Sequence, residues 1–383
     1  MLFEYIFGLT HITHHLTSSA DAGRIPHDQL FIGPAGSGTL STALSYARYL
    51  LCNNSQGENI NGDEACNIKC ASFTHPDLHF VFPVATSDKV KSHPVSDHYI
   101  EEWRKFLKEQ PYGNLFDWYR LIGIEKKQGQ IGVDEAQDIN KKLSLKAYEG
   151  GYKVMIIWMA EMMNTSSANK LLKLIEEPPE RTIMLLLVED EEKIMETIYS
   201  RCQVIHFPPL SEAVIAQALS EHGLSREEAM QVAHEANGNF NKAMDLMNKD
   251  SEELVFERWF VQWVRSAFKA KKNKGAIHEL ILWSEEVART GRETQKKFVM
   301  YCLALIRQAM LVHYGAHELA YMQIHVDGFQ LNNFAPFIHE QNLLEIVDAF
   351  EEAHYHIERN GNSKIIWTDL SIQLTRLLHK KAA

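Results

Sequence analysis

Short apolar runs that alternate with helical patterns constrain the first half of this 383-residue chain most strongly. Up to about residue 207, these runs read QLFIGP, LHFVFPV, KVMIIWM, TIMLLLVE and CQVIHFP. Continuously apolar runs separated by helices are typical of parallel strands buried on both faces. A helical pattern follows the first run at 41–51, and another reads SSANKLLKLIEEPPE, which Pro178 and Pro179 end. The pattern predicts a doubly wound α/β domain at 1–207 with an insertion at about 86–128.

The strand pattern disappears from about Leu210 onward. Three short helical segments, separated by Gly223 and Gly238, predict a small helical domain at 208–250. Longer segments with apolar residues at helical spacing then read EELVFERWFVQWVRSAFKA, RETQKKFVMYCLALIRQAMLVHYG, NLLEIVDAFEEAHYHIERNG and SKIIWTDLSIQLTRLLHK. Each of these segments has an apolar face and no glycine in its interior, so residues 251–383 are predicted to form an all-α domain. The segments show no pattern typical of a catalytic or ligand-binding site.

The composition narrows the class of protein. With 45% hydrophobic and 23% charged residues, the chain is typical of an ordered globular protein. Its net charge of −11 provides no general attraction to nucleic acid or to an anionic membrane, so we expect any DNA contact to be local or to belong to a partner. No membrane-spanning run and no signal peptide are recognisable, and the five cysteines fit a reducing compartment better than a disulfide scaffold. We therefore expect a cytoplasmic protein.

The segment GPAGSGTLSTA, directly after the first apolar run, has the glycines of a phosphate-binding loop but lacks its lysine. Gly33 and Gly38, with Gly36 between them, match the spacing G-x-x-x-x-G-K-[ST]. In a working loop the lysine reaches the β- and γ-phosphates and the next hydroxyl holds Mg²⁺. Here Thr39 and Leu40 stand at those positions. Losing one charge-assisted contact costs about 1.5–3 kcal/mol. A glycine-rich turn that never bound a nucleotide is the alternative.

The second half of such a site should be an apolar strand that ends in Asp-Glu. The candidate strand lies at 154–157, and Trp158 and Met159 occupy the acidic positions. Taken alone, a tryptophan and a methionine at the end of a strand indicate only that the strand end is part of the hydrophobic core. Together with Thr39, it predicts a site that can neither hold Mg²⁺ nor hydrolyse ATP.

Four segments point to a family: GRIPHDQLFIGPAGSG, HPDLHFVFP, SANKLLKLIEEPP and TIYSRCQVIHF. Their order and spacing resemble those of AAA+ clamp-loader subunits, and most of all the delta-prime type of the bacterial DNA polymerase III clamp loader, over 1–210. The segment GNFNKAMDL is similar to the end of that family's lid domain. TGRETQKKFVMYCLALIRQAML and NGNSKIIWTDLSIQLTRLL are similar to helices of its collar domain. The resemblance implies an AAA+ P-loop-like domain at 1–207, a lid at 208–250 and a collar at 251–383.

In that family, delta-prime resembles a rigid, nucleotide-free member of a five-subunit ring that loads the sliding clamp onto primed DNA. The resemblance implies a non-hydrolysing structural subunit with gamma/tau and delta subunits as partners, and contact with the clamp and primed DNA through the complex. Val188 after the sensor strand and Asn241 at the lid-arginine position agree with this role. An active gamma/tau-like ATPase is the alternative, which Thr39 and Trp158 disfavour, and a general DNA-binding module is a third, which the net charge disfavours.

The triplet Ser200, Arg201 and Cys202 matches a family motif that presents an arginine to the ATP of the neighbouring subunit. A guanidinium suits this chemistry because it is always charged and contacts a γ-phosphate through two N–H groups. Such an arginine is worth about 10³–10⁵ in rate. The resemblance therefore implies a trans-acting arginine finger. A solvated arginine ahead of the last strand is the alternative, and Cys202 is interpreted as a small buried residue.

Cys52, Cys66 and Cys70 fall where family members often carry a four-cysteine zinc module. His75 could complete a Cys₃His set. Because a fourth cysteine and the usual spacing are missing, we favour a degenerate loop without zinc and predict no metal or cofactor.

The insertion at 86–128 is rich in aromatic residues and also carries lysines and arginines. Such interleaving can indicate single-strand binding, but the acidic residues among them weaken that interpretation. We predict instead a helical hairpin that packs its aromatic side chains on the domain. These residues are Tyr99, Trp103, Phe106, Phe116, Trp118 and Tyr119.

Overall fold

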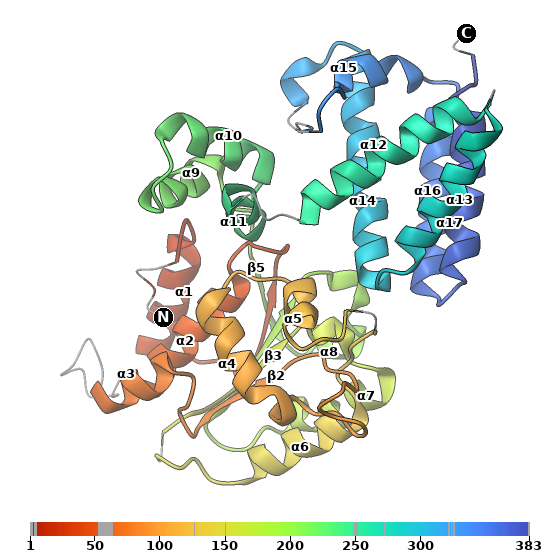
Figure 1. The fold of residues 1–383 in the computed structure, drawn as a ribbon. Coiled ribbons are helices and arrows are strands. Elements are labelled where there is room, and N and C mark those ends of the chain that lie inside the picture. Colours follow the sequence, from red (N-terminus) through yellow and green to blue (C-terminus); the bar gives the residue numbers. More distant parts are fainter. Residues whose placement is uncertain are drawn as a thin grey trace. The chain divides into compact units, whose positions relative to one another are not determined.

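The computed structural model in Figure 1 describes residues 3, 6–52, 64–125, 127–149, 151–248, 252–271, 273–320, 322, 324 and 326–381. The chain divides into two compact units. Unit 1 comprises Met1–Ile124 and Gly129–Met244, and unit 2 comprises Glu125–Gln128 and Asp245–Ala383.

Unit 1 is built on a sheet in which every strand pairing is parallel. Within the described residues the sheet has five strands, in the order β2-β3-β4-β1-β5. They are β1 Asp28–Ile32, β2 Leu78–Val81, β3 Lys153–Trp158, β4 Thr182–Val188 and β5 Gln203–His206. All five predicted strands are confirmed. Strands β1, β3 and β4 are buried along their whole length, whereas β5 is partly exposed because it forms an edge.

Helices of unit 1 connect these strands and pack on them. One buried cluster joins Leu30 and Leu186 of the sheet to Ile139 of α6 and Leu171 of α7. The bounds are α1 Thr10–Asp21, α2 Thr39–Cys52, α3 Glu64–Ala71, α4 Ile100–Glu109, α5 Leu115–Leu121, α6 Val133–Ser144, α7 Thr165–Glu176 and α8 Glu196–Tyr199. Three further helices follow the sheet in the chain, α9 Glu212–Glu221, α10 Arg226–Ala236 and α11 Phe240–Asn248.

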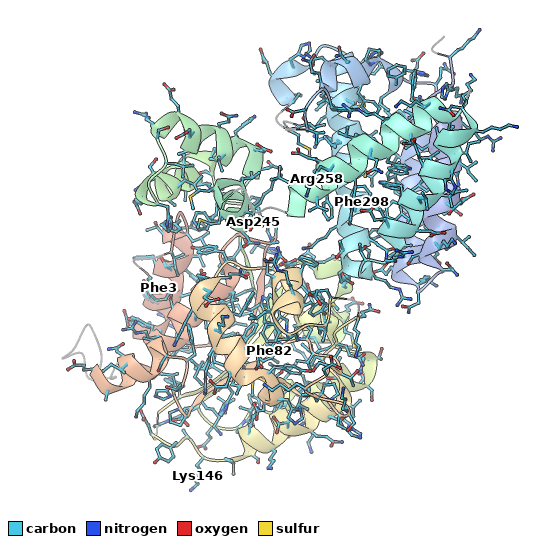
Figure 2. All side chains as sticks on the ribbon, in the orientation of Figure 1. Phe3, Phe82, Lys146, Asp245, Arg258 and Phe298 are labelled. Atoms are coloured by element: carbon cyan, nitrogen blue, oxygen red, sulfur yellow. A yellow bond between two sulfur atoms is a disulfide. The ribbon has the colours of Figure 1, made fainter. Side chains whose placement is uncertain are left out.

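Helices make up the regular structure of unit 2 in its described part, as the sequence predicted. They are α12 Glu252–Ala270, α13 Lys274–Ala288, α14 Arg292–His313, α15 Leu331–Phe334, α16 Leu343–Glu358 and α17 Ser363–Leu377. Trp263 and Trp283 stack with their ring centroids 4.6 Å apart, and Trp367 meets both edge-on. Phe298, labelled in Figure 2, is fully buried in the same core.

Among the residues that the structure describes, no helix has the length and apolar character needed to cross a bilayer.

Candidate functional site

The glycine loop joins β1 to α2, as its sequence predicted. Gly36 and Gly38 have φ angles of +72° and +93°, in the region that favours glycine. The Gly33 amide donates to the carbonyl of Val188 at 3.0 Å, which ties the loop to the end of β4. Thr39 begins α2. The strand–loop–helix geometry of a phosphate loop is therefore present, whereas the lysine that would make it bind strongly is absent.

Residues of the same chain cover this loop. The backbone N–H of Phe240, at the start of α11, donates to the carbonyl of Gly36 at 3.2 Å. A Cβ added at Gly36 would lie 2.0 Å from Oδ1 of Asn239, and one added at Gly38 would lie 3.1 Å from the ring of Tyr112. The rings of Tyr112 and Phe240 meet with centroids 4.9 Å apart. The loop thus contacts both α11 and the segment between α4 and α5.

Phe7 and Ser41 extend this contact. The ring centroid of Phe7 lies 5.2 Å from that of Phe240 and 6.2 Å from that of Tyr112. The Ser41 hydroxyl of α2 donates to the carbonyl of Pro111 at 2.9 Å. The first turns of α2 are therefore bonded to the insertion.

Trp158 stands at the end of β3, at the first position expected for an acidic residue. Its side chain is buried and packs against Trp103 and Phe106 of α4, with ring centroids 5.1 and 5.6 Å away. Met159 is also buried, with a φ of +56°. The end of β3 is therefore packed against the insertion by apolar side chains.

The insertion packs its aromatic residues as predicted. The rings of Trp103 and Phe82 stack at 4.2 Å, and Trp118 donates its indole N–H to the carbonyl of Pro83 at 2.9 Å. Tyr99, Trp103, Phe106, Trp118 and Tyr119 are buried. Phe116 is the exception and is only half-buried. This packing uses the aromatic faces that single-strand binding would need.

One carboxylate near this strand end was missed by the sequence analysis. Glu161 lies two residues beyond Met159 and accepts a hydrogen bond from the Glu189 amide at 2.9 Å. Burial raises the pKa of Glu161. Hydrogen bonds from backbone N–H groups, above all that of Glu189, lower the pKa and partly offset the effect of burial. Because this carboxylate accepts a hydrogen bond from the backbone that follows β4, it links the end of β3 to the end of β4.

The two other predicted departures from an ATP site have apolar or structural roles. Val188 ends β4 and is buried. Asn241 of α11 donates its side-chain N–H to the Asp117 carboxylate of α5 at 2.9 Å. Asp117 also accepts from the Asn114 amide at the start of α5. Asn241 therefore fastens α11 to the insertion.

Arg201 lies between α8 and β5, on the surface. Its Nε and Nη2 are both 2.8 Å from Oε1 of Glu176, at the end of α7. Its Nη1 donates to the carbonyl of Thr197 at 2.8 Å and lies 3.5 Å from the Ser200 hydroxyl. The side chain remains 38% exposed. A half-exposed ion pair of this kind is worth about 0–1 kcal/mol, so another anion can replace Glu176 at low cost.

Cys202, next to Arg201, is half-buried. Burial raises the pKa of its thiol to about 12, and the charge of Asp28 adds to this. The thiol is therefore protonated at neutral pH, as a small packing residue would be.

The expectation of free thiols is wrong for one pair of cysteines. A disulfide joins Cys52 and Cys66, because the end of α2 and the start of α3 bring their Cα atoms within 5.6 Å. Sγ of Cys70 lies 3.5 Å from that of Cys52. His75 is near Cys66, but its Nε2 contacts Glu149 at 3.1 Å. With two of the three sulfurs bonded to each other, the group does not offer the thiolates of a tetrahedral zinc site.

Comparisons with known proteins place the chain in a family. The family model described as DNA polymerase III, delta subunit, matches residues 8–211. DNA polymerase III subunit delta' of Bacillus subtilis is 28% identical over 235 residues, which cover 61% of this chain and 58% of that protein. The delta' subunit of Escherichia coli is 27% identical over 219 residues, or 57% of this chain and 53% of that protein.

Another relative matches more of the chain. DNA polymerase III subunit tau of Bacillus subtilis is 24% identical over 400 residues, which cover all of this chain and 62% of that protein. The matches thus span between about half and two thirds of these relatives' lengths. A gamma subunit-related protein of Thermotoga maritima superposes with a TM-score of 0.40 at 15% identity, covering 97% of this chain and 99% of that one. From the family model and the delta' relatives, the chain belongs to the DNA polymerase III delta-subunit family, as a delta-prime-like clamp-loader subunit.

Proposed function

We propose that the chain is a structural subunit of the DNA polymerase III clamp loader that does not hydrolyse ATP. In this proposal it assembles with gamma/tau and delta subunits in the cytoplasm, and it supports loading of the sliding clamp onto primed DNA. Residues 208–250 act as its lid and 251–383 as its collar. The observation that carries the proposal is the phosphate loop, which keeps its glycines but is covered by residues of its own chain.

Three features of the loop and of the neighbouring end of β3 argue against the alternative of an active gamma/tau-like ATPase. Thr39 supplies no charge to a phosphate, so about 1.5–3 kcal/mol of binding is lost. Trp158 supplies no carboxylate to Mg²⁺ and is packed against α4. The bond from the Phe240 amide to Gly36 closes α11 onto the loop. A nucleotide would have to displace packed aromatic groups and would gain little in return.

The same proposal assigns Arg201 to the nucleotide of a neighbouring subunit. Its contacts in this chain are with Glu176, Thr197 and Ser200, none of which belongs to the glycine loop. A triphosphate oxygen carries more charge than the half-exposed carboxylate of Glu176 and accepts the same two N–H groups. We therefore expect the guanidinium to exchange Glu176 for a γ-phosphate when the ring assembles.

Reconstituted rings test this assignment. Rings that carry Arg201→Ala should assemble normally but lose at least about tenfold in DNA- and clamp-stimulated ATPase at the site that the arginine serves. Arg201→Lys should restore only part of the rate, because an ammonium cannot make the paired contact. Arg226→Ala, an exposed arginine of α10, is the matched control. Full activity of assembled Arg201→Ala rings would reduce this residue to a surface arginine.

The proposed collar offers apolar side chains for assembly. Helices α13 and α17 pack against each other. Ile277 and Ile281 on α13, and Ile365 and Ile372 on α17, are exposed by 38–66% and recur at helical spacing on each helix. Such exposed stripes indicate a protein interface. Replacing Ile281 and Ile372 by lysine should block entry into the ring in size-exclusion chromatography. Met230 is an exposed apolar residue of α10, and Met230→Lys should leave entry into the ring unchanged. Normal assembly of the double variant would remove this face from the interface.

A further inference from the structure

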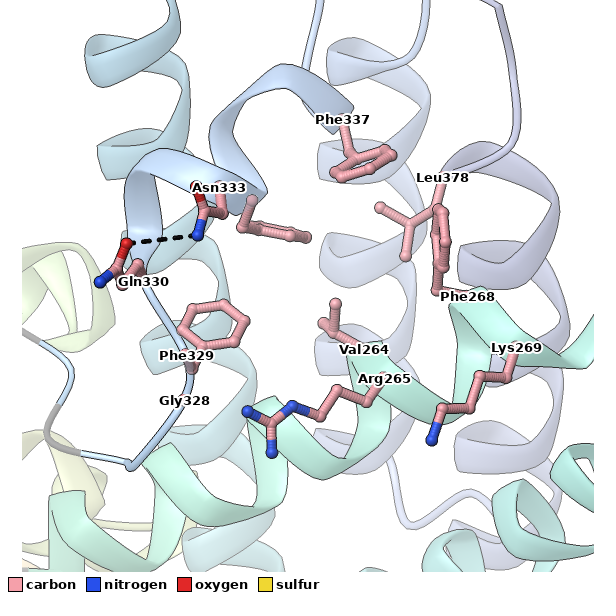
Figure 3. A pocket seen from close by; sticks show the side chains of 11 residues that line it. Val264, Arg265, Phe268, Lys269, Gly328, Phe329, Gln330, Asn333, Phe337 and Leu378 are labelled. Atoms are coloured by element: carbon pink, nitrogen blue, oxygen red, sulfur yellow. Dashed lines mark hydrogen bonds between the residues drawn. The ribbon is translucent and has the colours of Figure 1, made fainter.

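Unit 2 contains a pocket that the proposed function does not use (Figure 3). Its volume is about 220 Å³. The residues that line it come from α12, from the turn before α15, from α15 and the 3₁₀ turn after it, and from the position directly after α17. They are Val264, Arg265, Phe268, Lys269, Gly328, Phe329, Gln330, Asn333, Phe334, Phe337 and Leu378.

Aromatic rings that pack on one another form the walls. The centroids of Phe268 and Phe337 are 4.9 Å apart, and those of Phe329 and Phe334 are 5.9 Å apart. Phe334 is buried, whereas Phe268 is 45% exposed at the rim. A pocket of this volume is smaller than the 300–1,000 Å³ typical of small-molecule and cofactor sites. Its size suits one or two apolar side chains.

A glycine turn positions a cation at the mouth of the pocket. Gly328 has a φ of +69°, and a Cβ added there would lie 3.5 Å from Nη2 of Arg265. The same Nη2 donates to the carbonyl of Asp327 at 3.3 Å. The turn therefore both carries Phe329 into the wall and holds the guanidinium beside it.

The open side of the pocket is positively charged. Lys269 lies one helical turn beyond Arg265 on α12, and both side chains are exposed on the same side of the pocket in Figure 3. No acidic side chain lines the pocket, and neither cation forms an ion pair with a carboxylate in the described part of the chain. Asp327 is exposed, but it meets Arg265 through its backbone carbonyl. This is a cationic rim on a chain whose net charge is −11.

We propose that this pocket binds a segment of a partner protein in which an aromatic or large aliphatic side chain lies between acidic residues. The apolar side chain enters the space between the phenylalanine rings, and the carboxylates meet Arg265 and Lys269. Apolar walls with cations on one side are complementary to this chemistry, since the anchor supplies affinity and the charges supply orientation and encounter rate. A peptide of basic residues would be repelled, and a nucleotide is too large for the cavity.

Fluorescence anisotropy with the full-length chain tests the proposal. The probe is a fluorescein-labelled eight-residue peptide with one phenylalanine between two runs of aspartates. Saturable binding is expected, and it should weaken as salt rises. Arg265→Glu and Lys269→Glu should each weaken it about tenfold. Arg258→Glu, at an exposed arginine of the same helix outside the pocket, should leave it unchanged.

Two further measurements separate the contribution of the apolar side chain of the peptide from that of its carboxylates. A peptide with serine in place of phenylalanine should bind at least tenfold more weakly, because it cannot fill the pocket. A labelled single-stranded oligonucleotide of ten bases should not compete with the peptide. The proposal is overturned if binding of the probe does not saturate by 1 mM, if the serine peptide binds equally well, or if the oligonucleotide displaces the probe. Tryptophan fluorescence of each variant verifies that it is folded.

Discussion

Replacing Gly36 by alanine measures how tightly the chain closes over its own phosphate loop. The φ of +72° costs a residue with a Cβ about 1–2 kcal/mol. The new methyl group would also lie 2.0 Å from Oδ1 of Asn239 and 2.8 Å from the backbone N of Phe240. Relieving this overlap must lengthen the hydrogen bond from Phe240 to Gly36, which is worth about 0.5–1.5 kcal/mol. The variant should therefore lose about 2–3 kcal/mol of folding free energy.

Gly23→Ala is the matched control. Gly23 has nearly the same φ, +67°, but a Cβ added there meets nothing within 4 Å. This variant should lose only the backbone cost of about 1–2 kcal/mol. Urea unfolding followed by tryptophan fluorescence gives both values, and their difference reports the contact between the loop and α11. Equal losses for the two variants would refute the closed loop.

A double-mutant cycle sharpens the assignment. Asn239→Ala should be coupled to Gly36→Ala by about 1 kcal/mol, because it removes the oxygen that the new methyl group meets. The same change should show no coupling to Gly23→Ala.

Three further predictions concern a buried carboxylate, the buried thiols, and the catalytic groups that the phosphate loop lacks. Burial raises the pKa of Glu135 to about 7 from the ordinary 4.5, so this group lowers stability by up to about 3 kcal/mol as pH rises from 4.5 to 7. Glu135→Gln should therefore stabilise the chain in urea unfolding at pH 8 but not at pH 4, and an equal gain at both pH values would contradict this. Burial also raises the thiol pKa of Cys70 to about 11, that of Cys202 to about 12 and that of Cys302 well above its usual value. Iodoacetamide at pH 8 should label these three only after unfolding, as read by mass spectrometry, and rapid labelling of the folded chain would count against the packing. Thr39→Lys should not produce ATP hydrolysis in a phosphate-release assay, because Trp158 and Met159 stand at the two positions where the acidic residues are needed.

The sheet and most helices could be predicted because their signals are local. After their first residues, strands β3 and β4 are uninterrupted apolar runs, and α7 ends shortly before Pro178 and Pro179. Helix α13 was not predicted, although its sequence is apolar at helical spacing. The loop could also be predicted from a short segment of sequence, because its glycines follow a strand at a fixed spacing.

What covers the loop could not be predicted from the sequence. Tyr112 and Phe240 lie 76 and 204 residues beyond Gly36, so only the folded chain brings them to the loop. The same holds for Glu176, which contacts Arg201 from another helix. The disulfide between Cys52 and Cys66 also depends on how two helices meet, and a count of cysteines does not contain that information.

Equilibrium titration of the full chain with a fluorescent ATP analogue and Mg²⁺ shows directly whether the phosphate loop binds a nucleotide. We predict no saturable binding below millimolar concentration and no dependence on Mg²⁺. The reasons are that Thr39 and Trp158 provide neither a cation nor a carboxylate and that Phe240 bonds the loop. An ATP-hydrolysing gamma-type subunit measured in parallel should bind the analogue. Micromolar, Mg²⁺-dependent binding by this chain would rule out a loop closed to nucleotides and favour an active ATPase.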